Sequence, residues 1–457
     1  MAIKSRFSRI SALAICMLAV SETQGNSHLD TRILAIISAN GESASDLGLG
    51  NQSDDTAISA SIRPSLLWHA TDEMSFFSKG RLFYSTASLL QDSDEGGSSS
   101  DGFASLDELW GRYSFSPGQE GYSFKFGRQR IKETDSLWWD KDIDALRLSY
   151  NSTLLNGFFA AAQQLSAHRT DDSDFDERDE DILRVVGELE YEWHYAQRIS
   201  IRTMWQKDYS DHIKAGNSLA SIGTDTEDLD GIWLGFRLNG SISDEPGRWG
   251  YFLDIGYLTG ERQQISSTQQ NQVLEVHDQS IDGWAVDIGG WREWDHYLKP
   301  KLGFHIAQTS SGDGFVQTGL QSNRAYLTDF NSRFYRYGEL YRAELSNIRI
   351  YSLFSGIDWR RSHDFSVVLH HFTRLDNQAP VYSGGISADP ESTGSTLGSE
   401  LDLIYGWNIT EHMQKHWQRA EKSQVRARLA GFLPGNAYSA RADNFAYRIT
   451  LDLLMAF

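Results

Sequence analysis

The sequence predicts an all-β protein, a single transmembrane antiparallel β-barrel of about 18 strands of the outer-membrane type. Three observations predict this fold. Apolar and polar residues alternate along the chain, short and long connections alternate between the segments, and no apolar run of about 18 residues follows the N-terminal region. An alternating strand presents one face to lipid and the other to a wetted lumen.

The N-terminus predicts a secretory signal peptide over residues 1–21. Three cations within the first nine residues precede the apolar run Ile10 to Val20, and Ala19-Val20-Ser21 offers small residues for cleavage. Removing this segment also removes Cys16, the single cysteine, so we expect neither disulfides nor thiolate chemistry. Residues 22–457 are then one barrel domain.

The charge balance narrows the classes of partner. The chain has 62 Asp and Glu against 42 Lys and Arg, a formal net charge of −20. Such an acidic chain is a poor partner for nucleic acid. We expect a multi-pass barrel in the bacterial outer membrane, surrounded by its lipid, with no cofactor and no bound metal.

Eighteen segments alternate strongly enough to be predicted as strands. The clearest, at 180–194, places Leu189, Tyr191 and Trp193 on one face and Glu188 and Glu190 on the other. The predicted strands are 28–38, 56–69, 73–88, 105–115, 120–130, 142–150, 154–165, 180–194, 197–209, 228–241, 247–260, 281–294, 297–309, 345–360, 363–375, 397–409, 421–433 and 443–457.

The last segment is the most regular. Seven apolar residues stand at a spacing of two from Phe445 to Phe457, and the other phase is mostly polar. Ending on an in-phase aromatic is typical of the closing strand of outer-membrane barrels. A terminal strand of a soluble sandwich is the alternative.

Loop length decides between these two folds. Connections after even-numbered segments are short, as at 116–118 and 245–247, whereas those after odd-numbered segments are nearly all long, as at 210–227, 261–280 and 310–344. A barrel sorts its loops between two rims in this way, and both termini then lie on the short-turn side. Residues 410–422 break the rule, being charged and helical in pattern, and form either a periplasmic plug or docking segment or a plain long turn.

Charged residues in the inward phase are the candidate functional groups, because a lumen is wetted. Two of them, Arg426 and Arg428, project from one side of a strand about 7 Å apart, and many inward arginines in an acidic chain predict an anionic permeant. The arginines in this phase are Arg32, Arg63, Arg112, Arg147, Arg202, Arg237, Arg426, Arg428 and Arg448.

Several long motifs resemble one family. They are ELWGRYSF at 108–115, FKFGRQRIKETDSLWWDKDIDALRLSY at 124–150, TLLNGFFAAAQQ at 153–164, TGLQSNR at 318–324, SRFYRYGELYRAELSNI at 332–348, GSELDL at 398–403 and RARLAGFLPGNAY at 426–438. The chain resembles the alginate export family, eighteen-stranded outer-membrane porins that secrete an anionic polysaccharide. The resemblance covers essentially the whole mature chain.

The resemblance implies a pore constriction lined by basic residues with a few acids. Asp107 stands where the family has a basic residue, and Ala167 where it has an acid. Arg130 shares its strand phase with outward Phe124 and Phe126, so it reaches the lumen only if Gly127 forms a bulge. The implied constriction residues are Arg32, Arg63, Glu108, Arg130, Asp140, Asp171, Arg333, Arg426 and Arg428.

The expected function is therefore a channel that passes an anionic polysaccharide or its oligosaccharides, without catalysis. A diffusion porin for uptake of small anions or uronate oligomers is the first alternative, and a surface enzyme on a barrel is the second. We further expect the segment around Arg333 to Arg342 to lie inside the barrel, where its guanidiniums meet Asp140 or Asp171. Two weaker patterns, His412 with His416 and the acidic stretch 171–181, predict solvated surfaces more than metal sites.

Overall fold

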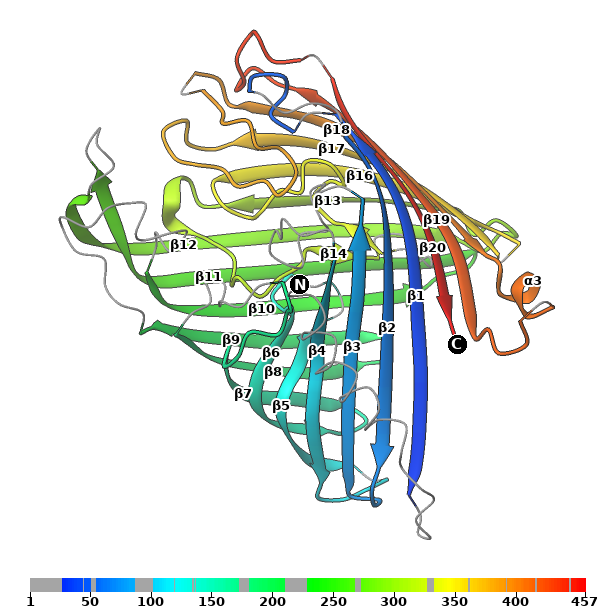
Figure 1. Cartoon of the computed structure of the whole chain (residues 1–457). Coiled ribbons are helices and arrows are strands. Elements are labelled where there is room, and N and C mark those ends of the chain that lie inside the picture. Colours follow the sequence, from blue (N-terminus) through cyan, green and yellow to red (C-terminus); the bar gives the residue numbers. More distant parts are fainter. Residues whose placement is uncertain are drawn as a thin grey trace, which may run out of the picture.

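The strands close into a barrel. In this computed structural model, which describes residues 27–43, 45–50, 55–86, 102–118, 120–133, 135, 137–171, 181–209, 228–267, 273–326, 333–360, 362–391, 393–415, 417–443 and 445–457, eighteen of the described strands form one sheet. It closes because β1 (His28–Glu42) pairs with both β2 (Asp55–His69) and β20 (Ala446–Ala456) (Figure 1). The other barrel strands are β3 (Met74–Ser85), β4 (Gly102–Ser114), β5 (Gly121–Lys132), β6 (Asp140–Asn151), β7 (Leu155–Gln163), β8 (Ile182–His194), β9 (Gln197–Asp208), β10 (Leu229–Ser243), β11 (Gly247–Ser267), β12 (Val273–Trp294), β13 (Lys301–Thr309), β16 (Ile348–Trp359), β17 (His363–Arg374), β18 (Thr396–Asn408) and β19 (Lys422–Pro434).

All eighteen predicted strands are confirmed, and one predicted loop is wrong. Residues 261–280 were expected to be a loop, but most of them continue the β11–β12 ladder. The β10 ladder ends at Arg262, and the β13 ladder begins at Ala285, so the hairpin projects past its neighbours on the long-loop side (Figure 1). Its Gln-rich sequence lacks the apolar alternation that marks strands within a membrane. The predicted signal peptide lies outside the described residues.

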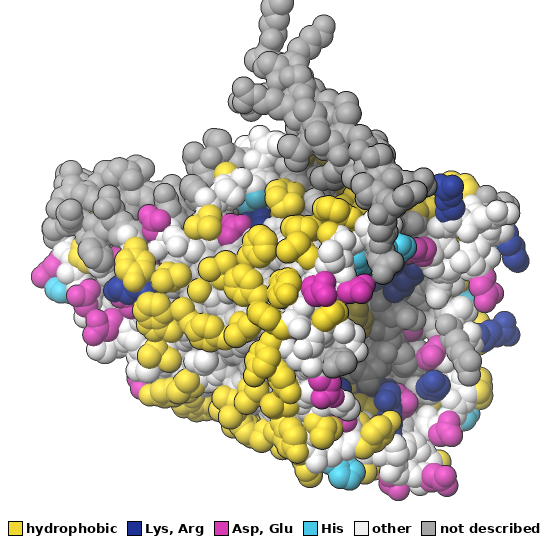
Figure 2. Space-filling view, turned by 90° about the horizontal axis from the view of Figure 1, so that it is seen from below, with side chains coloured by type: hydrophobic (Ala, Val, Ile, Leu, Met, Phe, Trp, Pro, Cys, Tyr) yellow, Lys and Arg dark blue, Asp and Glu magenta, His cyan; other side chains and the backbone are white. Residues whose placement is uncertain are grey.

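The two faces of the sheet carry opposite chemistry. Large apolar side chains that face outward remain exposed, as with Ile33, Leu109, Phe126 and Phe159. Figure 2 shows one broad band of such side chains, with charged residues gathered toward its margins. Five tryptophans near strand ends are also exposed, namely Trp68, Trp193, Trp249, Trp284 and Trp407. This arrangement suits a barrel that faces hydrocarbon.

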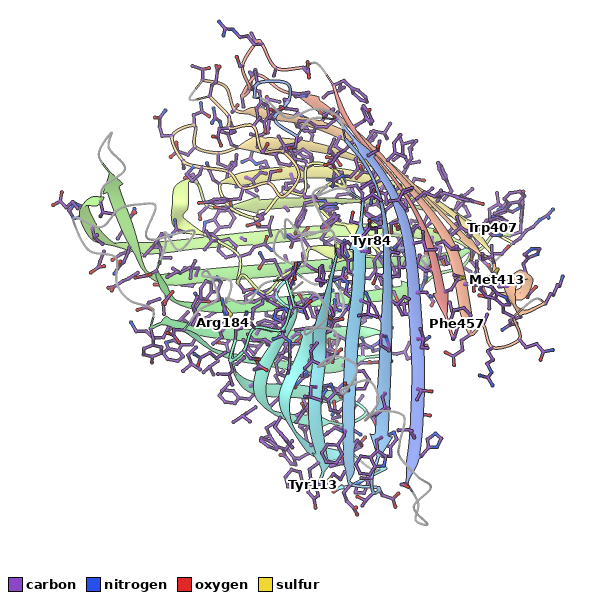
Figure 3. All side chains as sticks on the ribbon, in the orientation of Figure 1. Tyr84, Tyr113, Arg184, Trp407, Met413 and Phe457 are labelled. Atoms are coloured by element: carbon purple, nitrogen blue, oxygen red, sulfur yellow. The ribbon has the colours of Figure 1, made fainter. Side chains whose placement is uncertain are left out.

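The first and last strands are joined through the terminal residue. The backbone N–H of Phe457 donates to the Ile33 carbonyl at 2.9 Å, and the Ile33 N–H donates to the Phe457 carbonyl at 2.9 Å. The Phe457 ring lies 5.8 Å from that of Trp417. Figure 3 places Tyr113, Trp407 and Phe457 near strand ends on the short-turn side.

The connection at 410–422 is helical only in part. α3 (Thr410–Gln414) has five residues, and Figure 3 shows Met413 on it, at the short-turn end of the barrel. Within the part of the chain that the structure describes, no helix is long and apolar enough to cross a membrane.

The long connection between β13 and β16 folds back into the barrel. It contains η2 (Gly312–Gly314) and the two short strands β14 (Arg324–Ala325) and β15 (Phe334–Tyr335), which pair with each other. Its segment 333–347 is largely buried. We call its described residues, 310–326 and 333–347, the lumenal loop, and it places the site described next.

Candidate functional site

Asp140, the first residue of β6, joins the barrel wall to the lumenal loop. Its carboxylate is fully buried and lies 2.6 Å from Arg130 Nε of β5 and 3.0 Å from Arg333 Nη2 of the lumenal loop. Ser322 Oγ donates to the same carboxylate at 2.9 Å. A buried carboxylate needs such partners, since leaving one unpaired costs several kcal/mol, roughly. The expected contact between the segment 333–342 and Asp140 is therefore confirmed.

Gly127 turns Arg130 toward the lumen. Phe126 faces outward with 45% exposure, yet Arg128 and Arg130, in the same phase, contact Asp144 at 3.7 Å and Asp140 at 2.6 Å. Between them Gly127 has φ +106°, a value that side-chain-bearing residues rarely adopt. Arg130 therefore reaches the lumenal cluster, as predicted, but the ladders of β5 with β4 and β6 run through Gly127 without the register shift of a bulge.

A second irregularity brings two acids together on β4. Lys79 pairs with Glu108 and the next residue, Gly80, pairs with Leu106, so Asp107 is an extra residue. This β-bulge aims both carboxylates at Lys79 Nζ, 3.8 Å from Asp107 and 3.5 Å from Glu108. The Trp110 indole N–H also donates to Glu108 at 3.2 Å. Asp107, the departure from the family pattern, is thus neutralised by the adjacent lysine.

Arg426 and Arg428 of β19 share one partner. Asp452 Oδ2 lies 3.0 Å from Arg426 Nε and 3.1 Å from Arg428 Nη2. Arg428 also reaches Glu339 of the lumenal loop, with Nη1 3.1 Å from Oε2. The Arg426 side chain keeps 18% exposure and that of Arg428 only 8%. Arg426 therefore faces the lumen, whereas Arg428 fastens the loop.

The lumenal loop is tied to the opposite part of the wall as well. Asp287 of β12 accepts from Arg336 Nε at 2.6 Å and from the Tyr337 hydroxyl at 2.8 Å. Glu400 of β18 accepts from the backbone N–H groups of Leu340 and Tyr341 at 2.7 and 2.8 Å. These contacts reach strands far apart in the sheet, so the loop crosses the lumen.

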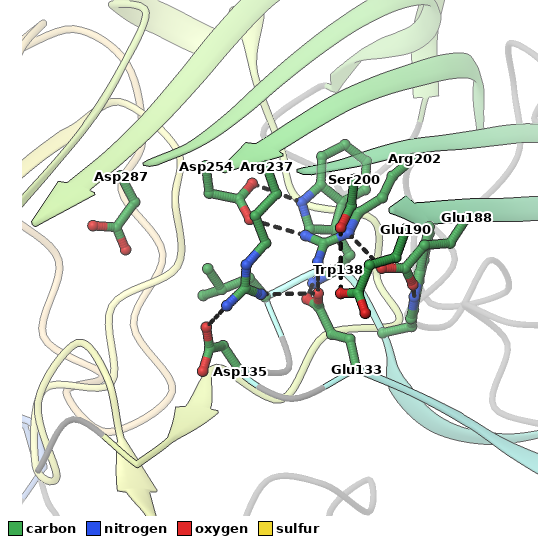
Figure 4. Close-up of polar contacts among 12 residues, drawn as sticks. Glu133, Asp135, Trp138, Glu188, Glu190, Ser200, Arg202, Arg237, Asp254 and Asp287 are labelled. Carbon is green, nitrogen blue, oxygen red and sulfur yellow. Dashed lines mark hydrogen bonds and ion pairs between the residues drawn. The ribbon is translucent and has the colours of Figure 1, made fainter. Parts of the chain in front are cut away.

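The described residues of a shorter connection between β5 and β6, namely 133, 135 and 137–139, also enter the lumen (Figure 4). Arg202 of β9 lies at their centre, contacting Glu133, with Nε 3.2 Å from Glu188 and Nη1 2.9 Å from Asp254. The Trp138 indole N–H donates to Asp254 at 3.0 Å. These contacts hold the described residues of this connection against β8, β9 and β11.

Arg237 of β10 extends this network. It contacts Asp135 and lies 3.5 Å from Glu133. Burial alone would raise the pKa of Asp135, but Arg237 and Arg336 hold it below its ordinary value. Asp135 therefore remains ionised, and its attraction to Arg336 links the connection between β5 and β6 to the lumenal loop electrostatically.

Three predicted residues lie apart from this centre. Arg32 is inward in phase but sits at the short-turn rim, with Nε 3.3 Å from Glu421 and 56% side-chain exposure. Arg63 faces inward and donates to Ser61 at 3.2 Å. Asp171 forms a two-point ion pair with Arg169, at 3.1 and 2.9 Å, where its segment runs beside the outer part of β4.

The structure therefore groups the predicted residues around two centres. Glu108, Arg130, Asp140 and Arg333 form one, because the Arg130 N–H also donates to Glu108 at 3.4 Å, and Arg426 with Arg428 form the other. Residues that sequence reasoning missed are mostly loop anchors, namely Glu133, Asp287, Glu339 and Glu400. Their signal was weak, since each is one charge in an inward phase or a long loop. Arg336 lies in the segment predicted to be lumenal, but it binds Asp287 and not Asp140 or Asp171.

Within the described ranges no group of three His, Asp or Glu side chains is arranged to hold a metal ion. His416 and residues 172–180 lie outside those ranges, so the two weaker patterns noted in the sequence stay predictions.

Comparison with known proteins gives the family. The Alginate export family model matches residues 29–452. "Alginate production protein AlgE" of Pseudomonas aeruginosa is 29% identical, over 95% of this chain and 93% of that protein, and the Pseudomonas syringae pv. tomato protein of the same name is 27% identical, over 92% of each.

Solved structures share this barrel fold. Acinetobacter baumannii OccAB1 has a TM-score of 0.61 at 10% identity, covering 96% of this chain and 98% of that one. Pseudomonas aeruginosa OccK2, solved in complex with glucuronate, has a TM-score of 0.57 at 11% identity, covering 94% and 98%. The chain is thus an outer-membrane β-barrel, and it belongs to the alginate export family.

Proposed function

We propose that this protein is an outer-membrane channel that exports an anionic polysaccharide of the alginate type through an arginine-lined constriction. The observation that carries the proposal is the Arg130–Asp140–Arg333 cluster, where a loop inside the barrel brings a guanidinium to the wall. The names of the curated relatives favour alginate as the polymer. The signal peptide at 1–21 belongs to the same proposal.

The exposed arginines are the ones that would meet the permeant. Side-chain exposure is 30% for Arg130, 17% for Arg333 and 18% for Arg426, against 3% for Arg336 and 8% for Arg428. Arg130, Arg333 and Arg426 can therefore donate hydrogen bonds to a sugar carboxylate in place of water. Arg336 and Arg428 position the loop. Arg63, also half-exposed and inward, extends the first set.

Passage of the polymer through the channel then requires no covalent bond to be made or broken. The guanidiniums of Arg130, Arg333 and Arg426 are already partly neutralised by Asp140 or Asp452, so a uronate carboxylate competes with a protein carboxylate for the same donor. Many weak sites in series let a polymer bind and leave, as permeation requires.

Two partners complete the proposal. The outward apolar face contacts outer-membrane lipid, and the segment 410–422, with α3 at the short-turn rim, offers a surface to a periplasmic export partner. The fold alone does not set the direction of transport, so uptake of uronate oligomers is the competing function.

Complementation separates export from uptake. In a cell that synthesises a polyuronate but lacks its own outer-membrane exporter, this chain should restore polymer to the medium. A matched variant with Arg130, Arg333 and Arg426 changed to Gln, and Asp140 changed to Asn so that no buried carboxylate is left unpaired, should restore much less while reaching the outer membrane at the normal level. Polymer retained in the periplasm by the folded wild type, together with faster uptake of oligouronates, would favour the diffusion porin.

A further inference from the structure

Three cations lie side by side on the lumenal face near the short-turn mouth. Arg112 of β4 is directly opposite Lys125 of β5, which is directly opposite Arg147 of β6. Their outward neighbours Tyr113 and Leu146 are exposed, so the three side chains are in the inward phase. They sit close to the short turn that joins β4 and β5.

None of the three is neutralised by a neighbour. Across the described ranges, no carboxylate oxygen lies within ion-pair distance of Arg112, Lys125 or Arg147, whereas the constriction arginines are held by Asp140 and Asp452. The carboxylates that face this region are engaged elsewhere. Glu108 is bound to Lys79, and Glu188 is bound to Arg202 and to the Trp139 indole.

Aromatic rings hold two of these cations in place. Lys125 Nζ lies 4.0 Å from the centre of the Trp110 ring, and Arg147 Cζ lies 4.0 Å from the centre of the Phe158 ring. Trp110 is itself stacked on Phe77 at 5.1 Å. Contact with a ring stabilises a cation without cancelling its charge.

Three adjacent cations repel one another, and a bound anion would relieve that repulsion. Like charges directly opposite each other on adjacent strands repel, and nothing in the register separates these three. In a wetted lumen the field of three close cations concentrates anions from solution.

We propose that Arg112, Lys125 and Arg147, flanked by Trp110 and Phe158, form a carboxylate-binding site for a uronate chain at the short-turn mouth of the channel. It rests on the proposed function only in taking an anionic sugar polymer as permeant. On β5, Lys125 is five residues nearer the short-turn end than Arg130, about 16 Å along the strand. The site therefore captures the polymer before it reaches the constriction.

Side-specific block of single channels tests this site. The full-length protein is inserted with known orientation into planar bilayers, and oligoguluronate or oligomannuronate is added to one side. The variant R112Q/K125Q/R147Q should raise the half-blocking concentration by about tenfold from the short-turn side, since a tenfold change corresponds to about 1.4 kcal/mol, near one charge-assisted contact. Block from the long-loop side should change much less.

Two further variants make the result specific. R198Q/R248Q/K299Q removes the same charge at the same rim, but Arg198 and Arg248 are bound to Glu192 and Glu293, so its half-blocking concentration should stay near that of the wild type. R112K/K125R/R147K keeps the three charges and should retain block. Heat-modifiable mobility on gels confirms that each variant is folded.

The outcomes separate this site from the general function. If the wild type is blocked and the triple Gln variant is blocked equally well, or if the control variant loses as much block, the site is overturned while the channel function stands. If oligouronates block the wild type from neither side, both fall.

Discussion

Arg426 and Arg428, two residues apart on β19, have different roles although they share Asp452. Arg426 is the more exposed and binds only that carboxylate among the contacts described above, whereas Arg428 also binds Glu339 of the lumenal loop. We expect R426Q to lower anion preference with little loss of stability. Reversal potentials in a salt gradient measure the first effect, and the temperature at which the folded band disappears on gels measures the second.

The matched substitution at Arg428 should lower stability more than it lowers anion preference. R428Q leaves Glu339 without its guanidinium, and removing one partner of a buried pair typically costs about 3 kcal/mol or more. Its unfolding temperature should therefore fall further than that of R426Q. Equal effects of the two substitutions on both readouts would show that the division of roles is wrong.

Gly127 offers a test of the change of strand phase. A Cβ built there would lie 2.4 Å from the Leu109 carbonyl oxygen, and the φ of +106° adds strain, so G127A should cost about 1–3 kcal/mol. Gly187 is the control, because a Cβ there meets its nearest atom at 3.4 Å without a positive φ. Folded yield after refolding in detergent should fall for G127A and not for G187A. Similar yields would contradict this account of the phase change.

For single residues, the sequence predicted well which arginines point into the lumen, but it did not predict which carboxylates they bind. Alternation places Arg426 and Arg428 in the lumen, and a glycine among outward aromatics marks the break before Arg130. It does not indicate that Glu339, some ninety residues away, meets Arg428, because that contact depends on the path of a long loop. Arg32 shows the same gap, since its depth in the barrel depends on register.

The lumenal loop is the element with the clearest functional consequence. Deleting 325–335 removes Arg333 and the β14–β15 pair, while no barrel strand is cut. Single-channel conductance should rise, and larger solutes should pass, because the cross-section at Asp140 is no longer occupied.

The projecting hairpin supplies the control for that deletion. Replacing 263–278 by a two-residue turn removes only the part of β11 and β12 that pairs with neither β10 nor β13. Because this part lies outside the closed barrel, conductance should be unchanged. A loop deletion that leaves conductance at the wild-type value would mean that the lumenal loop does not narrow the channel.

The last strand carries another prediction at this scale. Deleting Phe457 removes both backbone hydrogen bonds to Ile33 and the contact with Trp417. Assembly should be impaired, and the amount of heat-modifiable protein in the outer membrane is the measure. Substituting Phe457 by Ala keeps the backbone bonds, so a milder defect there would separate strand closure from the aromatic ring.

Sequence periodicity located every barrel strand because each has one lipid-facing side. It failed at 261–280, where the hairpin leaves the membrane and needs no apolar face. For the lumenal loop, the sequence predicted that its arginines lie inside the barrel near Asp140. It did not predict the rest of the path of the loop.

For the whole molecule, the sequence predicted closure, strand number and the sorting of loops between rims. These follow from local alternation and turn chemistry, which each segment records on its own. The arrangement inside the lumen could not be predicted in this way, because it depends on charged side chains from strands that are far apart in the sequence. Asp140 of β6, Asp287 of β12, Glu400 of β18 and Arg428 of β19 all bind one loop, and no local pattern encodes that convergence.

The dispersal of these anchors has a consequence for the order of folding. A docking surface that combines β6, β12, β18 and β19 is complete only when the sheet has curled far enough to bring those strands around one lumen. Contacts between residues so distant in sequence form late, since the chain must first lose the entropy of the intervening loops. We therefore expect the lumenal loop to dock as the last event of assembly, so that a newly closed barrel passes through a wide-open state before it acquires its selectivity.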